Sequence, residues 1–224
     1  MTGQGLEFIN VTKTFKLKTG AKCVLSGVSF SMPPRRISVL LGPSGSGKTT
    51  ILRLAAAFDK PDSGTMFLDG EEITKPSHKR FMVFQSFNQL FPWKSIEDNI
   101  IYALRSTRHV SADEARQISE YWLDETGLLE YRGELPSKLS GGMKQRAAIA
   151  RAFSLDPSLL LLDEPFSALD HDNKMSVLEL LRNLSEKNKT TVVFVTHDKQ
   201  EAAYLSDSAY FVNDGCVIQP EQLL

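Results

Sequence analysis

The feature that most constrains this fold is the segment "ISVLLGPSGSGKTT", which spans residues 37–50. It begins as a nearly all-apolar run, which is typical of a strand covered on both faces of a sheet. The run leads into a glycine-rich loop with the GxxxxGK[ST] pattern and then into a helical stretch. A strand, this loop and a helix, in that order, form a phosphate-binding loop, or P-loop. The segment therefore predicts an α/β fold with a nucleotide phosphate site.

The residue types of the P-loop explain why phosphates would bind there. Gly42, Gly45 and Gly47 allow backbone conformations that aim N–H groups inward at phosphate oxygens. Lys48 would supply a mobile positive charge to the β- and γ-phosphates, and Thr49 a hydroxyl to Mg²⁺. The alternative is a glycine-rich turn without a ligand. It is disfavoured because every required position is filled and both flanks have the right pattern.

A P-loop needs a carboxylate near its metal ion, and the stretch "LLLLDEP" provides one. Four apolar residues predict a buried strand, and Asp163 emerges at its carboxyl end, where ligands bind in open α/β sheets. Asp163 would hold Mg²⁺ through its water shell. Two adjacent acids repel unless a dication lies close or their side chains point apart. Glu164 would accept a proton from the water that attacks the γ-phosphate.

Two further polar residues follow strand-like runs at the same predicted edge of the sheet. His197 comes after "TVVFVT" and would contact the γ-phosphate and orient Glu164, although a lone histidine is more often structural. Gln85 ends "RFMVFQ" and would touch Mg²⁺ or the attacking water, a surface role being the ordinary alternative. The predicted catalytic residues are Glu164, His197 and Gln85, and those near the metal are Thr49, Gln85 and Asp163.

The pattern of the chain divides it into a core and an insertion. Strand-like and helical runs alternate on both sides of a long middle stretch, which predicts a parallel sheet. The middle stretch is helical, and its segment "SADEARQISEYWLDETG" opens with a capping box formed by Ser111 and Glu114. We therefore expect a core made of residues 1–85 and 158–224, and a helical subdomain at residues 86–157.

A second glycine-rich turn opens a helix in "LSGGMKQR", residues 139–146. Ser140, Gly141 and Gly142 directly precede the helical run "KQRAAIARAF". The first N–H groups of a helix and its dipole make such a turn a place to hold an anion. One chain therefore carries two turns that suit phosphate.

The order of these motifs resembles one family over almost the whole chain, the nucleotide-binding subunits of ABC transporters. "GPSGSGKTT" resembles its Walker A motif, "LLLLDE" its Walker B motif, "LSGGMKQR" its signature, Gln85 its Q-loop, Asp170 of "SALD" its D-loop and His197 its switch histidine. Phe15 lies where the family stacks an aromatic ring, more often tyrosine, on adenine. The resemblance implies ATP and Mg²⁺ as cofactors. The implied nucleotide-binding residues are Phe15, Gly42, Pro43, Ser44, Gly45, Ser46, Gly47, Lys48, Thr49 and Thr50.

The resemblance also implies an architecture and a mechanism. The fold would be an α/β P-loop NTPase with a mixed central sheet, an N-terminal antiparallel β subdomain and an inserted α-helical subdomain. Two subunits would pack head to tail, so that Ser140, Gly141 and Gly142 of one grip the γ-phosphate of ATP on the other. Asp170 would run along this interface. ATP binding would close the dimer and hydrolysis would reopen it.

A membrane-spanning permease is the partner that the resemblance implies. The family has a groove for a short permease helix near Phe91–Trp93, and core packing is the alternative role for Trp93. "FPW" together with "LSGGMKQR" is most similar to importers of nitrate, sulfonate, taurine and related solutes. A solute-binding protein would then be an indirect partner.

The same motifs bear on four other functions. An ABC exporter shares every ATP motif, because direction is set by the permease. A soluble ABC ATPase acting on DNA or ribosomes usually has a coiled-coil insertion or two ATPase units. A P-loop kinase would have no use for "LSGGMKQR". A binding module without hydrolysis is disfavoured by the presence of Glu164 and His197.

Composition sets further limits. The net charge of −1 gives no reason to expect nucleic-acid binding. The chain shows neither a secretory start nor an apolar run of about 18 residues. We therefore expect a cytoplasmic protein held at the inner face of the membrane by its permease, without a C-terminal regulatory domain. Cys23 and Cys216 lie in apolar stretches, which predicts that both are buried.

Overall fold

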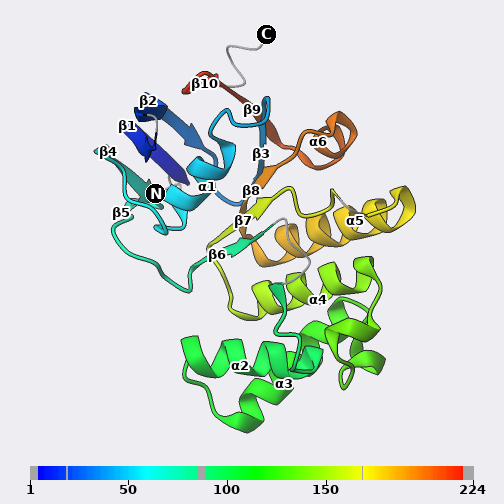
Figure 1. Cartoon of the computed structure of the whole chain (residues 1–224). Helices are drawn as coiled ribbons and strands as arrows, with labels where there is room; N and C mark the ends of the chain where they lie inside the picture. The colour runs from blue at the N-terminus through cyan, green and yellow to red at the C-terminus, as the bar shows by residue number, and fades with distance from the viewer. Residues whose placement is uncertain (1–4, 19, 85–88, 168, 219–224) are drawn as a thin grey trace.

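The computed structural model describes residues 5–18, 20–84, 89–167 and 169–218, arranged around two sheets (Figure 1). The larger sheet has the order β10-β9-β3-β8-β7-β6. Its strands are β3 (Ile37–Leu41), β6 (Arg80–Val83), β7 (Leu159–Asp163), β8 (Thr191–Val195), β9 (Ser208–Asn213) and β10 (Cys216–Ile218). Five of them pair in parallel and β10 runs antiparallel to β9, so this is a mixed central sheet, as predicted.

Both faces of the larger sheet are covered, which explains its continuous apolar strands. On β7, Leu159 and Leu161 belong to a core shared with α1 (Lys48–Ala55) and the smaller sheet. Leu160 and Leu162 belong to the opposite core, which includes residues of α4 (Gly141–Ser154) and α5 (His171–Asn188). Alternate side chains of one strand therefore fill two different cores.

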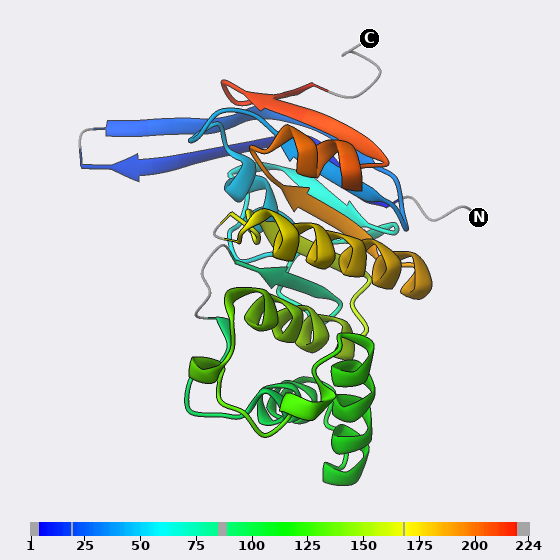
Figure 2. The ribbon, with the colours of Figure 1, turned by 90° about the vertical axis from the view of Figure 1, so that its right-hand side faces the viewer.

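The smaller sheet is antiparallel and has the order β2-β1-β4-β5. Its strands are β1 (Leu6–Leu17), β2 (Gly20–Met32), β4 (Ser63–Leu68) and β5 (Glu71–Glu72). The ribbon of β1 and β2 reaches beyond the rest of both sheets (Figure 2). This sheet is the predicted N-terminal antiparallel β subdomain.

In the described part of the middle of the chain, residues 89–157, the regular elements are all helices, joined by short loops. Its elements are α2 (Ile96–Thr107), α3 (Ala112–Glu125), η2 (Leu129–Tyr131), η3 (Pro136–Lys138) and α4. Ser111 caps α3 by accepting a hydrogen bond from the Glu114 N–H at 3.2 Å, as the capping box predicts. The helices form the end of the molecule farthest from the smaller sheet (Figure 1). The boundaries at residues 86 and 157 stay a prediction.

The prediction that Cys23 and Cys216 are buried is wrong, because both thiols are exposed. Cys23 lies near the start of β2, where the two-stranded ribbon extends past the core. Cys216 lies on β10, which is the edge strand of the larger sheet. Apolar neighbours in sequence do not bury a side chain where the strand lacks a covering layer. Among the described residues, no helix is both long and apolar enough to cross a membrane.

Candidate nucleotide site

The loop between β3 and α1 has a backbone that only glycine fits at two positions. Gly42 has φ +142°, and a Cβ there would lie 2.1 Å from the Val212 carbonyl oxygen of β9. Gly47, at the start of α1, has φ +110°, and a Cβ there would lie 3.1 Å from a methyl group of Val24. The sheet and the β1–β2 ribbon thus confine the loop from two sides.

Lys48 lies buried in this loop, with 6% of its surface exposed. Its Nζ donates hydrogen bonds to the carbonyl oxygens of Gly42 and Pro43 at 2.9 and 2.8 Å. Burial lowers the pKa of the Lys48 ammonium, and the charges of Glu164 and Asp163 oppose that shift. The buried Ser46 hydroxyl has no hydrogen-bond partner in the described part of the chain. A buried cation and an unpaired hydroxyl in one loop suit an anionic ligand.

Asp163 ends β7 and faces the first turn of α1. Its Oδ1 accepts a hydrogen bond from the Thr49 hydroxyl at 3.2 Å. Burial raises the pKa of the Asp163 carboxyl, and the hydrogen bond from Thr49 acts in the opposite direction. A carboxylate and a hydroxyl held together fit Mg²⁺, which takes few protein oxygens and completes its shell with water and phosphate.

Glu164 has an uncommon backbone conformation for a side chain of its size, with φ 44°. Its N–H donates to the Val195 carbonyl oxygen at 3.0 Å, which ties it to the end of β8. Its Oε2 lies 3.1 Å from Nδ1 of His197. Strained backbone of this kind is typical of functional sites. The structure thus brings together the predicted base and the predicted switch histidine, which come from neighbouring parallel strands.

Phe15 reaches the P-loop from the β1–β2 ribbon. It lines a cavity of about 300 Å³ together with Lys48, Thr49 and Glu164. The other lining residues are Val24, Ser44, Gly45, Gly47 and Thr50. An aromatic ring, a phosphate loop and a carboxylate thus face one space. Gln85, the other predicted residue of this site, lies outside the described residues.

The signature residues occupy a different place. Ser140 caps α4 by accepting a hydrogen bond from the Met143 N–H at 3.3 Å, and its side chain is exposed. A Cβ on Gly142 would lie 3.1 Å from Oδ1 of Asn173 in α5. Among the described residues that line the P-loop cavity, none comes from the signature. In the described part of the chain, the two turns predicted to hold an anion do not line one pocket.

Asp170 caps α5, beside the signature. Its carboxylate accepts hydrogen bonds from the Asn173 backbone N–H at 3.1 Å and from the Asn173 amide at 2.7 Å. The side-chain hydrogen bond from Asn173 is the main cause that lowers the pKa of Asp170. The predicted D-loop residue and the signature thus meet at the first turn of one helix.

Sequence reasoning missed two sets of contacts around the site. Gln145, which is 1% exposed, donates a hydrogen bond to the Pro165 carbonyl oxygen at 2.7 Å and so ties α4 to the segment after Glu164. Lys174 of α5 forms an ion pair with the buried Glu201 of α6 (Lys199–Leu205), next to His197. Nothing in the spacing of these residues predicts their contact.

Comparisons with known proteins agree with this geometry. A family model described as "ABC transporter" matches residues 25–167. The nitrate import ATP-binding protein NrtD of Synechococcus elongatus is 42% identical over 211 residues, which cover 94% of this chain and 77% of that protein. The aliphatic sulfonates import ATP-binding protein SsuB of Bacillus thuringiensis is 42% identical over 197 residues, which cover 88% of this chain and 76% of that protein.

The fold has a close match among solved structures as well. The ATP-binding cassette MJ0796, in a dimeric post-hydrolysis state bound to ADP and Pi, superposes with a TM-score of 0.83 at 30% identity. The match covers 98% of this chain and 99% of that one. Family model, relatives and fold agree: this chain belongs to the ABC transporter family.

Proposed function

We propose that this chain is the ATP-hydrolysing subunit of an ABC importer, and that ATP closes a head-to-tail pair of subunits whose reopening follows hydrolysis. One observation carries the proposal. Lys48 and Glu164 line an open cavity to which Ser140, Gly141 and Gly142 of the same chain contribute nothing. A signature helix that opens onto solvent is accounted for if it completes the site of a second copy. The dimeric state of the cassette named above supports the pairing of two copies.

The proposed chemistry follows from the positions of the side chains. The Lys48 ammonium would exchange the carbonyl oxygens of Gly42 and Pro43 for phosphate oxygens. Glu164 would accept a proton from water as the water oxygen attacks the γ-phosphorus and the bond to the β–γ bridging oxygen breaks. His197, through its contact with Glu164, would orient the carboxylate toward the attacking water. The products are ADP and inorganic phosphate.

Thr49 and Asp163 would hold Mg²⁺ beside the phosphates. When bound, the ion would offset the negative charge that accumulates on the phosphate oxygens. Phe15, which lines the same cavity as Glu164, would stack on adenine. Gln85 is proposed to contact the metal or the attacking water on the strength of the motif alone.

Head-to-tail pairing would give the signature residues their role. The N–H groups at the start of α4, where Gly141 and Gly142 carry no side chains of their own, would bind the γ-phosphate of the partner's ATP. The Ser140 hydroxyl would join them. Asp170, at the start of α5, would lie along the contact between copies. Loss of the γ-phosphate would remove the charge that bridges the two surfaces.

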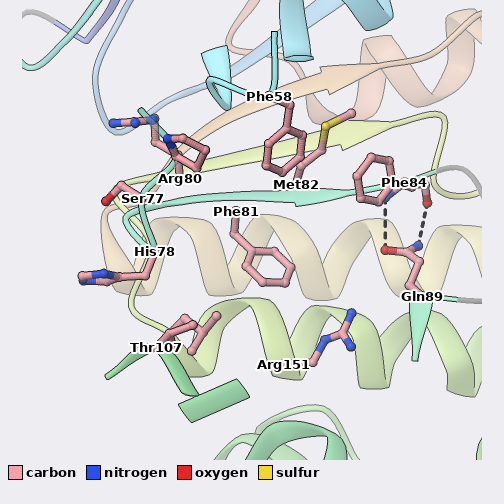
Figure 3. A pocket seen from close by; sticks show the side chains of 12 residues that line it. Phe58, Ser77, His78, Arg80, Phe81, Met82, Phe84, Gln89, Thr107 and Arg151 are labelled. Carbon is pink, nitrogen blue, oxygen red and sulfur yellow. Dashed lines mark hydrogen bonds between the residues drawn. The ribbon is translucent and has the colours of Figure 1, made fainter. Parts of the chain in front are cut away.

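A groove beside the edge strand β6 fits a helix of a membrane permease. It encloses about 640 Å³, and Phe58 and Phe84 stand at its rim with 46% and 41% of their surfaces exposed (Figure 3). Their rings stack at 6.3 Å, and Gln89 holds the end of β6 through two hydrogen bonds to the Phe84 backbone at 3.1 and 2.6 Å. An apolar rim of this kind is a docking surface for an amphipathic helix.

The charge inside the groove favours an acidic group on that helix. Arg80, Arg151 and His78 are among its lining residues, and none of the described residues that line it is acidic. Arg151 is 8% exposed, and in the described part of the chain its Nε has no hydrogen-bond partner. Burial lowers the pKa of Arg151 to about 10. A buried cation without a carboxylate is costly, so a partner that supplies one would be stabilised there.

The predicted docking residues Phe91 and Trp93 follow shortly after Gln89, which lines this groove. Trp93 is 72% exposed, which disfavours the alternative that it packs in the core. The Phe91 ring contacts Trp93 at 5.6 Å and Tyr102 at 5.2 Å, so the three form one aromatic cluster on the helical side. We propose that the cluster extends the docking surface of the groove.

Docking can be tested with the permease by co-purification from membranes. Phe58→Glu should abolish co-purification because it places a charge on the apolar rim of the groove. Ile9→Glu is the matched control, since Ile9 has a similar exposure of 44% but lies on β1. Equal recovery of both variants with the permease would contradict the assignment of the groove.

The named relatives support import, and small anions of the nitrate and sulfonate kind, as the transported class. A solute-binding protein outside the membrane and a location at the inner face would follow from that role. An exporter or a soluble ABC ATPase is not favoured, because these relatives are named as import proteins.

Ser140→Arg tests the function directly. The variant should bind ATP like wild type but neither dimerise nor hydrolyse, because the new side chain fills the space for the partner's phosphate. Ser111→Arg is a matched control, because Ser111 caps α3 in the same way but lies outside the signature. If both variants hydrolyse ATP equally well, the composite site is excluded.

A further inference from the structure

The first turn of α5 touches three segments that the proposed mechanism uses. Asp170 caps it and belongs to the D-loop. Asn173 lies against Gly142 of the signature: a Cβ added to Gly142 would lie 3.1 Å from the Asn173 Oδ1. Lys174 extends toward the loop that follows β8, which carries His197. A movement of this turn would therefore be transmitted through Lys174 to the loop that carries His197.

Lys174 makes two ion pairs at that loop. Its Nζ lies 2.8 Å from Oε1 of Glu201 and 3.2 Å from Oδ2 of Asp198. The side chains of Lys174 and Glu201 are only 17% and 5% exposed. The pKa of Lys174 is raised, chiefly by its hydrogen bond to Glu201. The pair with Glu201 is therefore shielded from solvent, unlike a surface pair, whose net contribution is small, whereas Asp198 is 32% exposed.

Glu201 passes this restraint to the loop through Thr196. The second oxygen of Glu201 accepts a hydrogen bond from the Thr196 hydroxyl at 2.6 Å. The same hydroxyl accepts a hydrogen bond from the Asp198 N–H at 3.0 Å. Thr196 and Asp198 flank His197, whose own side chain is 67% exposed and contacts Glu164. The position of the imidazole therefore depends on how its two neighbours are held.

We propose that Lys174 is a positioning residue, which ties the first turn of α5 to the His197 loop so that the histidine follows the D-loop and the signature. The inference rests on the proposed function, since it assigns a regulator to the same site. It links the surface where a second copy would dock to the geometry of Glu164. Closure of the dimer would then set the hydrolytic residues in place.

A purely structural role for Lys174 is the competing explanation. Removing the ammonium leaves the Glu201 carboxylate buried without a cation, which destabilises a fold regardless of any role in positioning. Lys174→Met alone does not separate the two explanations if it unfolds. The double variant Lys174→Met/Glu201→Gln does, because it removes both charges and keeps an acceptor for Thr196 while breaking the tie to α5.

Steady-state kinetics and thermal melting of these variants form the first test. We expect the double variant to melt near wild type, with kcat about 10-fold lower and KM for ATP within about 2-fold, because misplacing a catalytic group lowers the rate more than the binding. Lys174→Arg should keep the rate, since it preserves both ion pairs. Lys187→Met is the control from the same helix, because its ion pair with Glu125 at 2.7 Å lies at the other end of α5.

The ring signal of His197 in the nucleotide-free protein is the second test, and it does not depend on hydrolysis. The chain has four histidines, so each ring can be assigned by single substitution in NMR spectra. The double variant should displace the His197 signal, and Lys187→Met should leave it unchanged. A stable double variant with wild-type kcat and an unmoved His197 signal would overturn the proposal. If wild type itself hydrolyses no ATP, the proposed function fails. The His197 ring signal then remains the test of whether Lys174 positions the histidine.

Discussion

Nδ1 of His197 lies 3.1 Å from Oε2 of Glu164, although the two residues follow different strands. The contact exists because β7 and β8 run in parallel and end in register, with Asp163 opposite Val195. Glu164 is held there in a strained conformation with φ 44°, and its N–H is bonded to Val195. Backbone strain, strand register and one side-chain contact thus fix the proposed base at one point of the sheet edge.

His197→Ala should lower kcat about 100-fold or more, because Glu164 loses the group that orients its carboxylate. The affinity for ATP should stay within about 3-fold, since the P-loop is untouched. Single-turnover hydrolysis and equilibrium binding would measure the two effects. His109→Asn, at an exposed position just after α2, is the control, because it lies outside the nucleotide site and the proposed subunit contact. A kcat for His197→Ala equal to that of this control would contradict the role.

Lys48→Ala should weaken ATP binding about 30-fold or more, because the ammonium is the buried cation of the loop. Fluorescence titration with an ATP analogue would measure the dissociation constant. Lys187→Ala, which removes a lysine far from the loop, should bind like wild type. Unaltered affinity in Lys48→Ala would count against the phosphate site.

Asp163→Asn should stabilise the nucleotide-free protein at pH 7 and weaken Mg²⁺-dependent hydrolysis. Burial raises the folded-state pKa of Asp163, so its contribution to stability is present at low pH and is lost as the pH rises through that raised pKa. The amide avoids this loss and still accepts the hydrogen bond from Thr49. We expect a melting temperature about 2 °C higher at pH 7, the scale of a small stability change in a chain of this size.

The pH dependence supplies the control for that prediction. At about pH 3.5 the carboxyl is mostly protonated in both folded and unfolded chains, so the advantage of Asp163→Asn should disappear. Differential scanning fluorimetry across this range measures it. An advantage that stays constant down to pH 3.5 would show that ionisation of Asp163 is not its source.

Glu164→Gln should retain ATP binding and lose hydrolysis, because an amide cannot accept the proton from water. The ATP-bound dimer should then become long-lived, since the γ-phosphate that bridges the copies is no longer removed. Size-exclusion chromatography with Mg²⁺ and ATP would show the dimer, and ADP is the control nucleotide. A variant that stays monomeric with ATP and hydrolyses normally defeats the assignment.

The residues at the edge of the larger sheet could be predicted from the sequence, because a buried strand is a continuous apolar run and the first polar residues after it mark its end. Lys48, Asp163 and His197 each follow such a run, and the ends of parallel strands meet at one edge of a sheet. The strain at Glu164 could not be predicted, because it depends on the bond from its N–H to β8. Cys23 was wrongly placed, because an apolar run looks the same whether or not a layer covers it.

Contacts between helices could not be predicted from the sequence either. The pair of Lys174 and Glu201 joins two helices whose separation is set by the packing of α5 and α6 on the sheet. Each residue alone reads as a solvated charge on a helix surface. The predicted role of Ser140 came from its turn and from family resemblance, and the structure adds that Ser140 does not line the cavity of its own P-loop.

The central claim is that Lys48 of one copy and Ser140 of another hold the same ATP, and mixing two defective variants tests it most directly. Lys48→Ala and Ser140→Arg, each combined with Glu164→Gln, should both remain at the 25.0 kDa of one chain when Mg²⁺ and ATP are added separately. Their mixture contains one intact composite site, so light scattering should detect a heterodimer of twice that mass with one tightly held ATP. A mixture that stays monomeric, while Glu164→Gln alone dimerises, would contradict the claim.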